Sequence, residues 1–97
     1  MIVVKDAFEF EWDKGNTKKN EKHNVADKEA EEVFFDGNKF IYKDKLHSKH
    51  EERFVVLGVT EKDRLLYVVF TKRGKRVRII SARDINKKEV KIYEETT

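Results

Sequence analysis

Several segments of the chain follow the two-residue period of apolar and polar positions that is typical of strands. Residues 8–12 alternate aromatic with acidic side chains, which predicts a half-buried strand with its aromatic residues facing inward. Residues 39–44 alternate in the same way and predict an edge strand. Residues 54–59 are almost entirely apolar, which favours a central strand covered on both faces.

The longest apolar segment predicts a β-hairpin. Residues 65–71 and 77–82 have strand length and are rich in β-branched and aromatic side chains. Between them, Lys72-Arg73-Gly74 predicts a three-residue loop, because Gly74 can take the positive φ that such a loop needs at its last position. Regular alternation in the return strand places Val77, Ile79 and Ser81 on one face, and Arg76, Arg78 and Ile80 on the other.

Three helices complete the pattern. Residues 14–23 predict a helix with almost no apolar face, ended by Asn24, which tolerates the left-handed conformation. A second helix is predicted between a cap at Asp27 and an end at Gly37, with apolar residues three and four positions apart. The capping box Asn86-Lys-Lys-Glu89 predicts the start of a C-terminal helix.

The order β-α-α-β-β-β-β-α indicates a single α+β domain over residues 1–97. We expect an antiparallel β-sheet with two N-terminal helices and a C-terminal helix, all packed on one side. The chain contains no Cys, so it offers no disulfide, no thiolate metal site and no Cys nucleophile. Because no apolar run approaches the roughly 18 residues of a membrane span, we expect a cytoplasmic protein with no membrane partner.

Positive charge is concentrated in one quarter of the chain. Residues 72–91 hold nine Lys or Arg against two Asp or Glu, a balance of +7, although the net charge of the whole chain is only +3. This concentration is expected of a surface that binds phosphate groups, and an ordinary solvated face is the alternative.

Short motifs recur through almost the whole chain in a characteristic order. They are Phe10-Glu-Trp-Asp13, Asn20-Glu-Lys-His23, Glu52-Arg-Phe54, Gly58, Thr71-x-x-Gly74, Arg78-Ile-Ile-Ser-Ala-Arg83, Glu89 and Tyr93-Glu94. In this order and spacing the chain resembles the BrnT family, ribonuclease toxins of type II toxin–antitoxin pairs whose compact fold is similar to that of RelE and ParE toxins. The sequence departs from the family at Asn24, where Gly is usual, and at Asn86, where Thr or Ser is usual. Both exchanges keep the local capping chemistry.

The resemblance implies RNA cleavage without a metal or other cofactor, and silencing by a neighbouring antitoxin that resembles BrnA and has a ribbon-helix-helix part. Such cleavage needs a base for the ribose 2′-hydroxyl, cations for the phosphorane and an acid for the leaving 5′-oxygen. Arg78 and Arg83 are the candidates for the cations, because a guanidinium matches two phosphate oxygens and stays charged. The alternative is that one of these arginines pairs with Glu52 or Glu89 to hold the sheet against a helix.

The remaining candidate residues supply proton transfer and phosphate binding. His23 and His47 are candidate acids or bases, since an imidazole pKa of about 6.5 suits proton transfer near neutrality. The spacing of the His residues matches no zinc pattern, so we expect no metal. Residues expected to bind flanking RNA phosphates are Lys22, Arg53, Lys72, Arg73, Lys75 and Arg76.

Two other functions remain open from the sequence. A nucleic-acid-binding module without catalysis would need only the basic hairpin. A toxin of related fold could also act by protein contact, as ParE-like toxins do against gyrase, because fold alone does not fix function.

Overall fold

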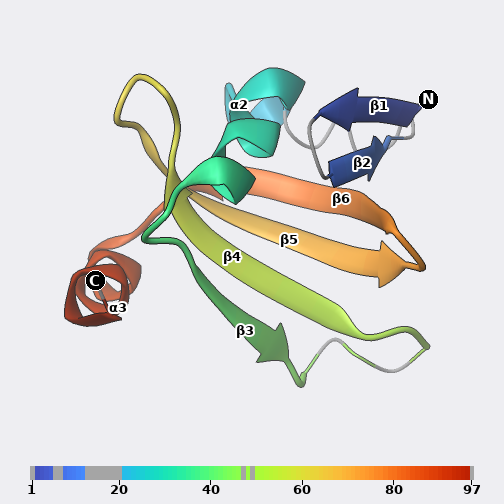
Figure 1. The fold of residues 1–97 in the computed structure, drawn as a ribbon. Coiled ribbons are helices and arrows are strands. Elements are labelled where there is room, and N and C mark those ends of the chain that lie inside the picture. Colours follow the sequence, from blue (N-terminus) through green and yellow to red (C-terminus); the bar gives the residue numbers. More distant parts are fainter. Residues whose placement is uncertain (1, 6–7, 13–20, 47, 49, 97) are drawn as a thin grey trace.

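The computed structural model describes residues 2–5, 8–12, 21–46, 48 and 50–96. Within them, a single sheet contains six strands in the order β1-β2-β6-β5-β4-β3, with helices at one face and one end (Figure 1). The elements are β1 (Ile2–Lys5), β2 (Phe8–Glu11), α2 (Asp27–Glu32), the 3₁₀ helix η1 (Val33–Phe35), β3 (Phe40–Asp44), β4 (Arg53–Val59), β5 (Leu65–Arg73), β6 (Arg76–Asp84) and α3 (Lys87–Thr96).

The sheet is mixed, and the prediction of a wholly antiparallel sheet is wrong. β2 runs parallel to β6, whereas every other neighbouring pair is antiparallel. A parallel pair needs a long crossover, and the 64 residues between Glu11 and Arg76 supply one, whose described part contains α2, η1, β3, β4 and β5. β1 was also not predicted, because its short apolar run has no alternation to mark it as a strand.

One face of the sheet, the core face, packs against α2 and η1. Phe34 lies edge-on to Phe10 and Phe70, with ring centroids 5.3 and 5.0 Å away, and all three side chains are almost fully buried. Burying each of these rings stabilises the fold by about 2–3 kcal/mol. β4 approaches η1 closely at Gly58, where an added Cβ would lie 2.9 Å from the carbonyl oxygen of Val33. The strand can approach so closely only because this position has no side chain.

The predicted helices are confirmed in part. Ala26, not Asp27, is the N-cap of α2, and its N–H donates to the Glu29 carboxylate at 3.0 Å. The regular helix ends at Glu32 and continues as η1, so the predicted end at Gly37 is wrong. Asn24 has the expected left-handed φ of 55°. Of the first predicted helix, only its last residues lie within the described part, and positions 21 and 22 are helical.

The hairpin turn is tighter than predicted. The strands extend to Arg73 and Arg76, which pair with each other, so the turn consists of Gly74 and Lys75 alone. The predicted three-residue loop is therefore wrong, while Gly74 does take a positive φ of 61°.

A β-bulge in β6 reverses the alternation predicted for the second half of that strand. Ile80 is an extra residue between the ladder pairs made by Ile79 and Ser81. As a result, Ser81 and Arg83 share the face of Arg78, and the prediction that Ser81 lies on the opposite face from Arg78 is wrong. Without the bulge, Arg83 would point toward the core face.

α3 lies at an end of the sheet, away from α2, and contacts the face opposite the core face (Figure 1). The prediction that all helices pack on one side is therefore wrong. The predicted capping box is confirmed: the Glu89 N–H donates to the Asn86 side chain, and the Asn86 N–H donates to the Glu89 carboxylate, both at 2.9 Å. In the part of the chain that the structure describes, no helix is long and apolar enough to cross a membrane.

Candidate nucleic-acid interface

The sheet face opposite the core face carries five arginines, and we call it the arginine face. Residues that pair directly across neighbouring strands point to the same face of a sheet. Each of these arginines pairs with a residue whose side chain points away from α2, so all five lie on this face. The five residues are Arg53 on β4, Arg73 on β5, and Arg76, Arg78 and Arg83 on β6. The structure thus brings together five of the ten residues predicted from the sequence to bind or cleave RNA.

Three of these arginines form a cluster with two glutamates at the hairpin end of the face. Arg73 and Arg76 lie 3.3 and 3.8 Å from the carboxylate of Glu11 on β2. Arg78 lies 3.6 Å from the carboxylate of Glu51, which also pairs with Arg73 at 3.6 Å. Arg78 also lies 3.9 Å from Glu11, so three guanidiniums and two carboxylates form one ion-pair cluster.

Arg83 is held at the other end of the face. Its guanidinium donates to both oxygens of the Glu89 carboxylate, at 2.9 and 2.7 Å, and stacks 3.8 Å from the centroid of the Tyr67 ring. The ion pair with Glu89 raises the pKa of Arg83. Burial favours the neutral form of Glu89, yet hydrogen bonds from Arg83 and Asn86 hold the pKa of the Glu89 carboxyl below its ordinary value.

The alternative role considered for these arginines is therefore confirmed for Arg83, which joins the sheet to α3. Arg78 pairs with Glu51 instead of the neighbouring Glu52. The Glu52 carboxylate accepts a hydrogen bond from Lys43 at 3.2 Å. The Arg83 side chain as a whole is still one-third exposed.

Two tyrosines lie beside Arg83 on the arginine face. Tyr42 on β3 and Tyr67 on β5 point to the same face, with β4 between their strands. Burial, together with Tyr67, raises the pKa of Tyr42 to about 12. Val55 and Leu57 of β4, on the same face between them, are fully buried. The tyrosines therefore form a half-exposed aromatic surface over a buried apolar floor.

The two groups of charge occupy opposite ends of β6. Arg83 follows Arg78 by five positions, one of which is the bulge residue, so the Cα atoms of these two arginines are separated by roughly 13 Å at the rise of a strand. An RNA strand that contacted both guanidiniums would lie along the sheet.

Other predicted residues lie elsewhere. His23 is exposed and adjoins Arg64 and Asp84, since Arg64 donates to the His23 carbonyl oxygen at 3.4 Å and Asp84 pairs with Arg64 at 2.7 Å. Ladder register directs Asp84 toward the core face, away from Arg83. Lys72 also lies on the core face, 5.6 Å from the Phe54 ring centroid. Lys22 and Lys75 are exposed outside the strands, and His47 lies outside the described residues.

Tyr93 of α3 is held at the end of the sheet. Its hydroxyl donates to the carboxylate of Asp36 at 2.6 Å, and the same carboxylate oxygen accepts the N–H of Val59 at 3.0 Å. Burial favours the neutral acid, but these hydrogen bonds lower the pKa of Asp36. Burial and Asp36 raise the pKa of Tyr93 to about 12. This contact anchors α3 and does not reach the arginine face.

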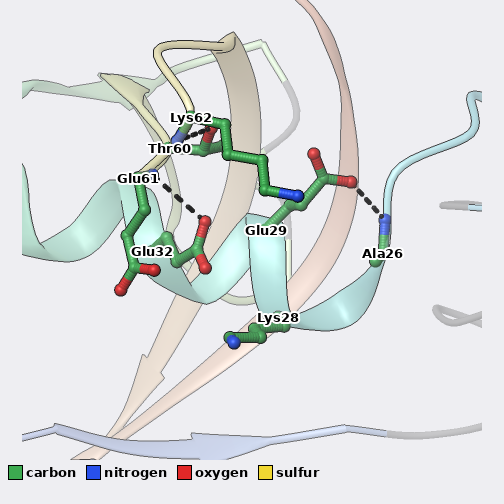
Figure 2. A pocket seen from close by; sticks show the side chains of 7 residues that line it. All are labelled: Ala26, Lys28, Glu29, Glu32, Thr60, Glu61 and Lys62. Carbon is green, nitrogen blue, oxygen red and sulfur yellow. Dashed lines mark hydrogen bonds between the residues drawn. The ribbon is translucent and has the colours of Figure 1, made fainter.

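An open pocket of about 380 Å³ lies on the opposite side, between α2 and the turn after β4 (Figure 2). Its lining mixes acidic and basic side chains, and two of its glutamates support the backbone. Glu29 accepts from the N–H of Ala26, and Glu32 accepts from the N–H of Glu61 at 3.2 Å. Because these carboxylates hold loops in place, we place the candidate site on the arginine face and not in this pocket.

Sequence reasoning missed the glutamates and tyrosines of the face. Glu11 and Glu51 meet the hairpin arginines only through the β2–β6 and β4–β5 pairings, which no local pattern marks. The alternation in residues 39–44 did put Tyr42 on a defined face, but its contact with Tyr67 depends on the register across β4. Among the described residues, no group of three His, Cys, Asp or Glu is arranged to hold a metal ion.

Comparison with known proteins gives one family. The family described as "Ribonuclease toxin, BrnT, of type II toxin-antitoxin system" matches residues 12–89, which include every strand from β3 to β6 and the start of α3. No curated protein matches the chain.

Proposed function

The chain belongs to the BrnT family of ribonuclease toxins of type II toxin–antitoxin systems, and from that premise we propose that it cleaves RNA bound along the arginine face. The observation that carries the proposal is the β-bulge at Ile80, which turns Arg83 to the same face as Arg78. Bulges commonly redirect side chains beside active sites. Substrate RNA would then meet arginines at both ends of β6.

The chemistry of these side chains suits cleavage by the substrate's own 2′-hydroxyl. Attack on phosphorus builds negative charge on the phosphorane, and guanidiniums stabilise that charge through paired hydrogen bonds. Arg83 would serve this role, and Arg78, whose Cα lies about 13 Å away along β6, would hold a flanking phosphate together with Arg53, Arg73 and Arg76. The proposed proton acceptor is His23 or His47, and the reaction would need no metal.

The arginines at the hairpin end are suited to binding phosphate. Arg73, Arg76 and Arg78 gather there, and a phosphate can take the place of a carboxylate as the partner of a guanidinium. Lys75 in the adjacent turn adds a further exposed cation. Phosphates bound here would position the RNA without reading its bases.

The same face is the surface that we propose an antitoxin covers. A protein that silences the toxin must exclude RNA, and an acidic segment would complement the arginines of this face. From the family we expect a BrnA-like partner with a ribbon-helix-helix part, encoded beside this gene. We further propose a RelE-like arrangement in which residues 14–23 complete a second N-terminal helix.

The proposal is tested by incubating the purified protein with end-labelled RNA in excess EDTA. We expect cleavage, with products that carry 2′,3′-cyclic phosphate and 5′-hydroxyl ends. Binding without cleavage would instead identify a nucleic-acid-binding module, and neither binding nor cleavage would favour action by protein contact. The control is the same protein purified as a complex with its co-expressed antitoxin, and this complex should not cleave the RNA.

A further inference from the structure

We propose that the outer edge of β3 binds an extended, acidic segment of the antitoxin, which adds a strand to the sheet. The inference rests on the proposed function, since it takes the antitoxin as the partner, and it identifies where that partner docks. It starts from the place of β3 in the sheet. Among the described strands, β3 pairs only with β4, and it is the outermost strand, across the sheet from β1 (Figure 1).

The backbone of an edge strand can pair with a further strand. N–H and C=O groups of alternate residues point outward from the sheet there, and an extended peptide can bond to them. β3 offers five residues, Phe40–Asp44, which is the length of an ordinary strand. In binding of this kind the main chain supplies affinity, and the side chains beside the edge select the partner. The side chains of β3 therefore indicate what would bind.

The apolar core of the protein ends at β3. Ile41 pairs across the strands with Val56, which pairs with Val68, and both valines are fully buried. Ile41 lies on the same face but is 42% exposed, and Leu46, two residues after the strand, is 84% exposed. An apolar side chain on an added strand would cover Ile41 and extend the core by one strand, which removes exposed apolar surface from water.

Positive charge surrounds this apolar side chain. Residues 37–50 contain four Lys against one acidic residue, Asp44. Lys43 lies on the face of Ile41, since its cross-strand partner Phe54 packs against the core. Lys43 pairs with Glu52 at 3.2 Å, but the two side chains are 44% and 66% exposed. Because such exposed pairs contribute little stability, a carboxylate of a partner can replace Glu52. A segment that alternates apolar and acidic residues fits this edge.

The same lysines disfavour a second copy of this chain as the partner. If two β3 strands paired antiparallel about Ile41, Lys43 of one copy would face Lys39 of the other. If they paired about Lys43, the two copies of that lysine would face each other. Like charges directly opposite each other destabilise a strand pair, and lysines on edge strands commonly prevent self-association. The charge pattern therefore favours an acidic segment over a second copy.

An added strand would also border the arginine face. Phe40 and Tyr42 point to that face, with ring centroids 5.6 Å apart, so alternate side chains of the bound segment would lie beside these rings. From this border the rest of the antitoxin could extend over the arginines and exclude RNA. Docking at β3 and covering of the arginine face are thus compatible in one partner.

Hydrogen exchange of backbone amides, resolved by residue with NMR, tests the addition of a strand. The toxin is measured alone and in complex with the co-expressed protein that is encoded beside its gene. The amides of Phe40–Asp44 that exchange fast in the free toxin should exchange at least about tenfold more slowly in the complex, because the new strand bonds them. β1, at the opposite edge, is the internal control and should not change. Unchanged exchange along β3 would overturn the inference.

Affinity for the same protein tests the side chains. Ile41→Thr and Lys43→Glu should each weaken binding by about tenfold or more, because the first removes apolar surface and the second brings like charges together. Lys62→Glu is the matched control, since it reverses an exposed charge in the turn after β4, and it should bind as the wild type does. When free, all three variants should cleave RNA at the wild-type rate, which also shows that they are folded.

The outcomes separate this inference from the proposed function. Wild-type affinity in both β3 variants would overturn the inference and leave the ribonuclease proposal in place. Protection of β3 in the free toxin that rises with toxin concentration would assign the edge to a second copy, and would also overturn it. A free wild-type protein that does not cleave RNA would contradict the proposed function, whatever the binding result.

Discussion

The guanidinium of Arg83 on β6 binds both oxygens of the Glu89 carboxylate on α3, at 2.9 and 2.7 Å. Glu89 is nearly buried, and it also accepts the N–H of Asn86 as part of the helix cap. One ion pair thus starts α3, joins it to the sheet and fixes the guanidinium over Tyr67. The first prediction concerns its contribution to stability.

Arg83→Ala should lower the free energy of unfolding by about 2 kcal/mol, because Glu89 is then left largely buried without its partner. Glu89→Ala should cost a similar amount, plus the loss of the helix cap. The double variant should cost clearly less than the sum of the two, since it leaves neither charge unpaired. Urea unfolding of the four proteins measures this, and strictly additive losses would show that the pair is not coupled.

Catalysis separates the electrostatic role of Arg83 from its structural role. At a temperature at which the wild type and the variants are all folded, Arg83→Ala should cleave RNA more slowly than the wild type by about tenfold or more. The reason is that it removes a charge that faces the phosphorane. Lys75→Ala should mainly weaken RNA binding and make it less dependent on salt. Glu89→Gln is the matched control, because it breaks the same ion pair but retains the guanidinium. If Glu89→Gln loses as much activity as Arg83→Ala, the arginine acts only through α3.

Gly58 is predicted to be essential to the packing of β4 on η1. Gly58→Ala should destabilise the protein by about 2 kcal/mol, because the new Cβ would lie 2.9 Å from the Val33 carbonyl oxygen and the backbone would have to shift. Gly37→Ala is the control, since nothing lies within 4 Å of its Cβ position. Thermal melts should show a lower Tm for the first variant only. A Gly58→Ala protein as stable as the wild type would mean that the strand and helix separate easily.

The contact between Tyr93 and Asp36 should give stability a defined dependence on alkaline pH. The folded state raises the pKa of Tyr93 from 10.0 to about 12, so it favours the protonated hydroxyl. The contribution of this group is therefore complete below about pH 10 and is lost as the pH rises toward about 12. The Tm difference between the wild type and Tyr93→Phe should shrink across that window. A difference that stays constant from about pH 8 to about pH 12 would contradict the linkage.

Local patterns predicted most of the strands and the residues that form the core. The alternation around Phe10 predicted which face of that strand is buried, and the spacing of Ala30, Val33 and Phe34 predicted which face of the helix is buried. All four residues are buried in the structure. The left-handed Asn24 and the capping box at Asn86 were also predictable, because a few neighbouring residues decide each of them.

Features set by distant parts of the chain were not predictable in this way. The bulge at Ile80 and the parallel pairing of β2 with β6 arise from how whole strands fit together. Both alter the candidate site, since the bulge moves Arg83 to the arginine face and the pairing brings Glu11 to the hairpin arginines. The sequence supplied the arginines of the site, whereas their carboxylate and tyrosine neighbours required the register of the sheet.

A single 2′-deoxy substitution tests most directly whether the substrate's own hydroxyl is the nucleophile. The RNA is first cleaved to locate one preferred linkage, and a matched RNA is then made that lacks the 2′-hydroxyl only at that linkage. We expect the two RNAs to bind the protein equally, because phosphate contacts dominate affinity. The substituted linkage should not be cut, while secondary sites in the same RNA are cleaved as before. Cleavage of the 2′-deoxy linkage at an undiminished rate would contradict the mechanism.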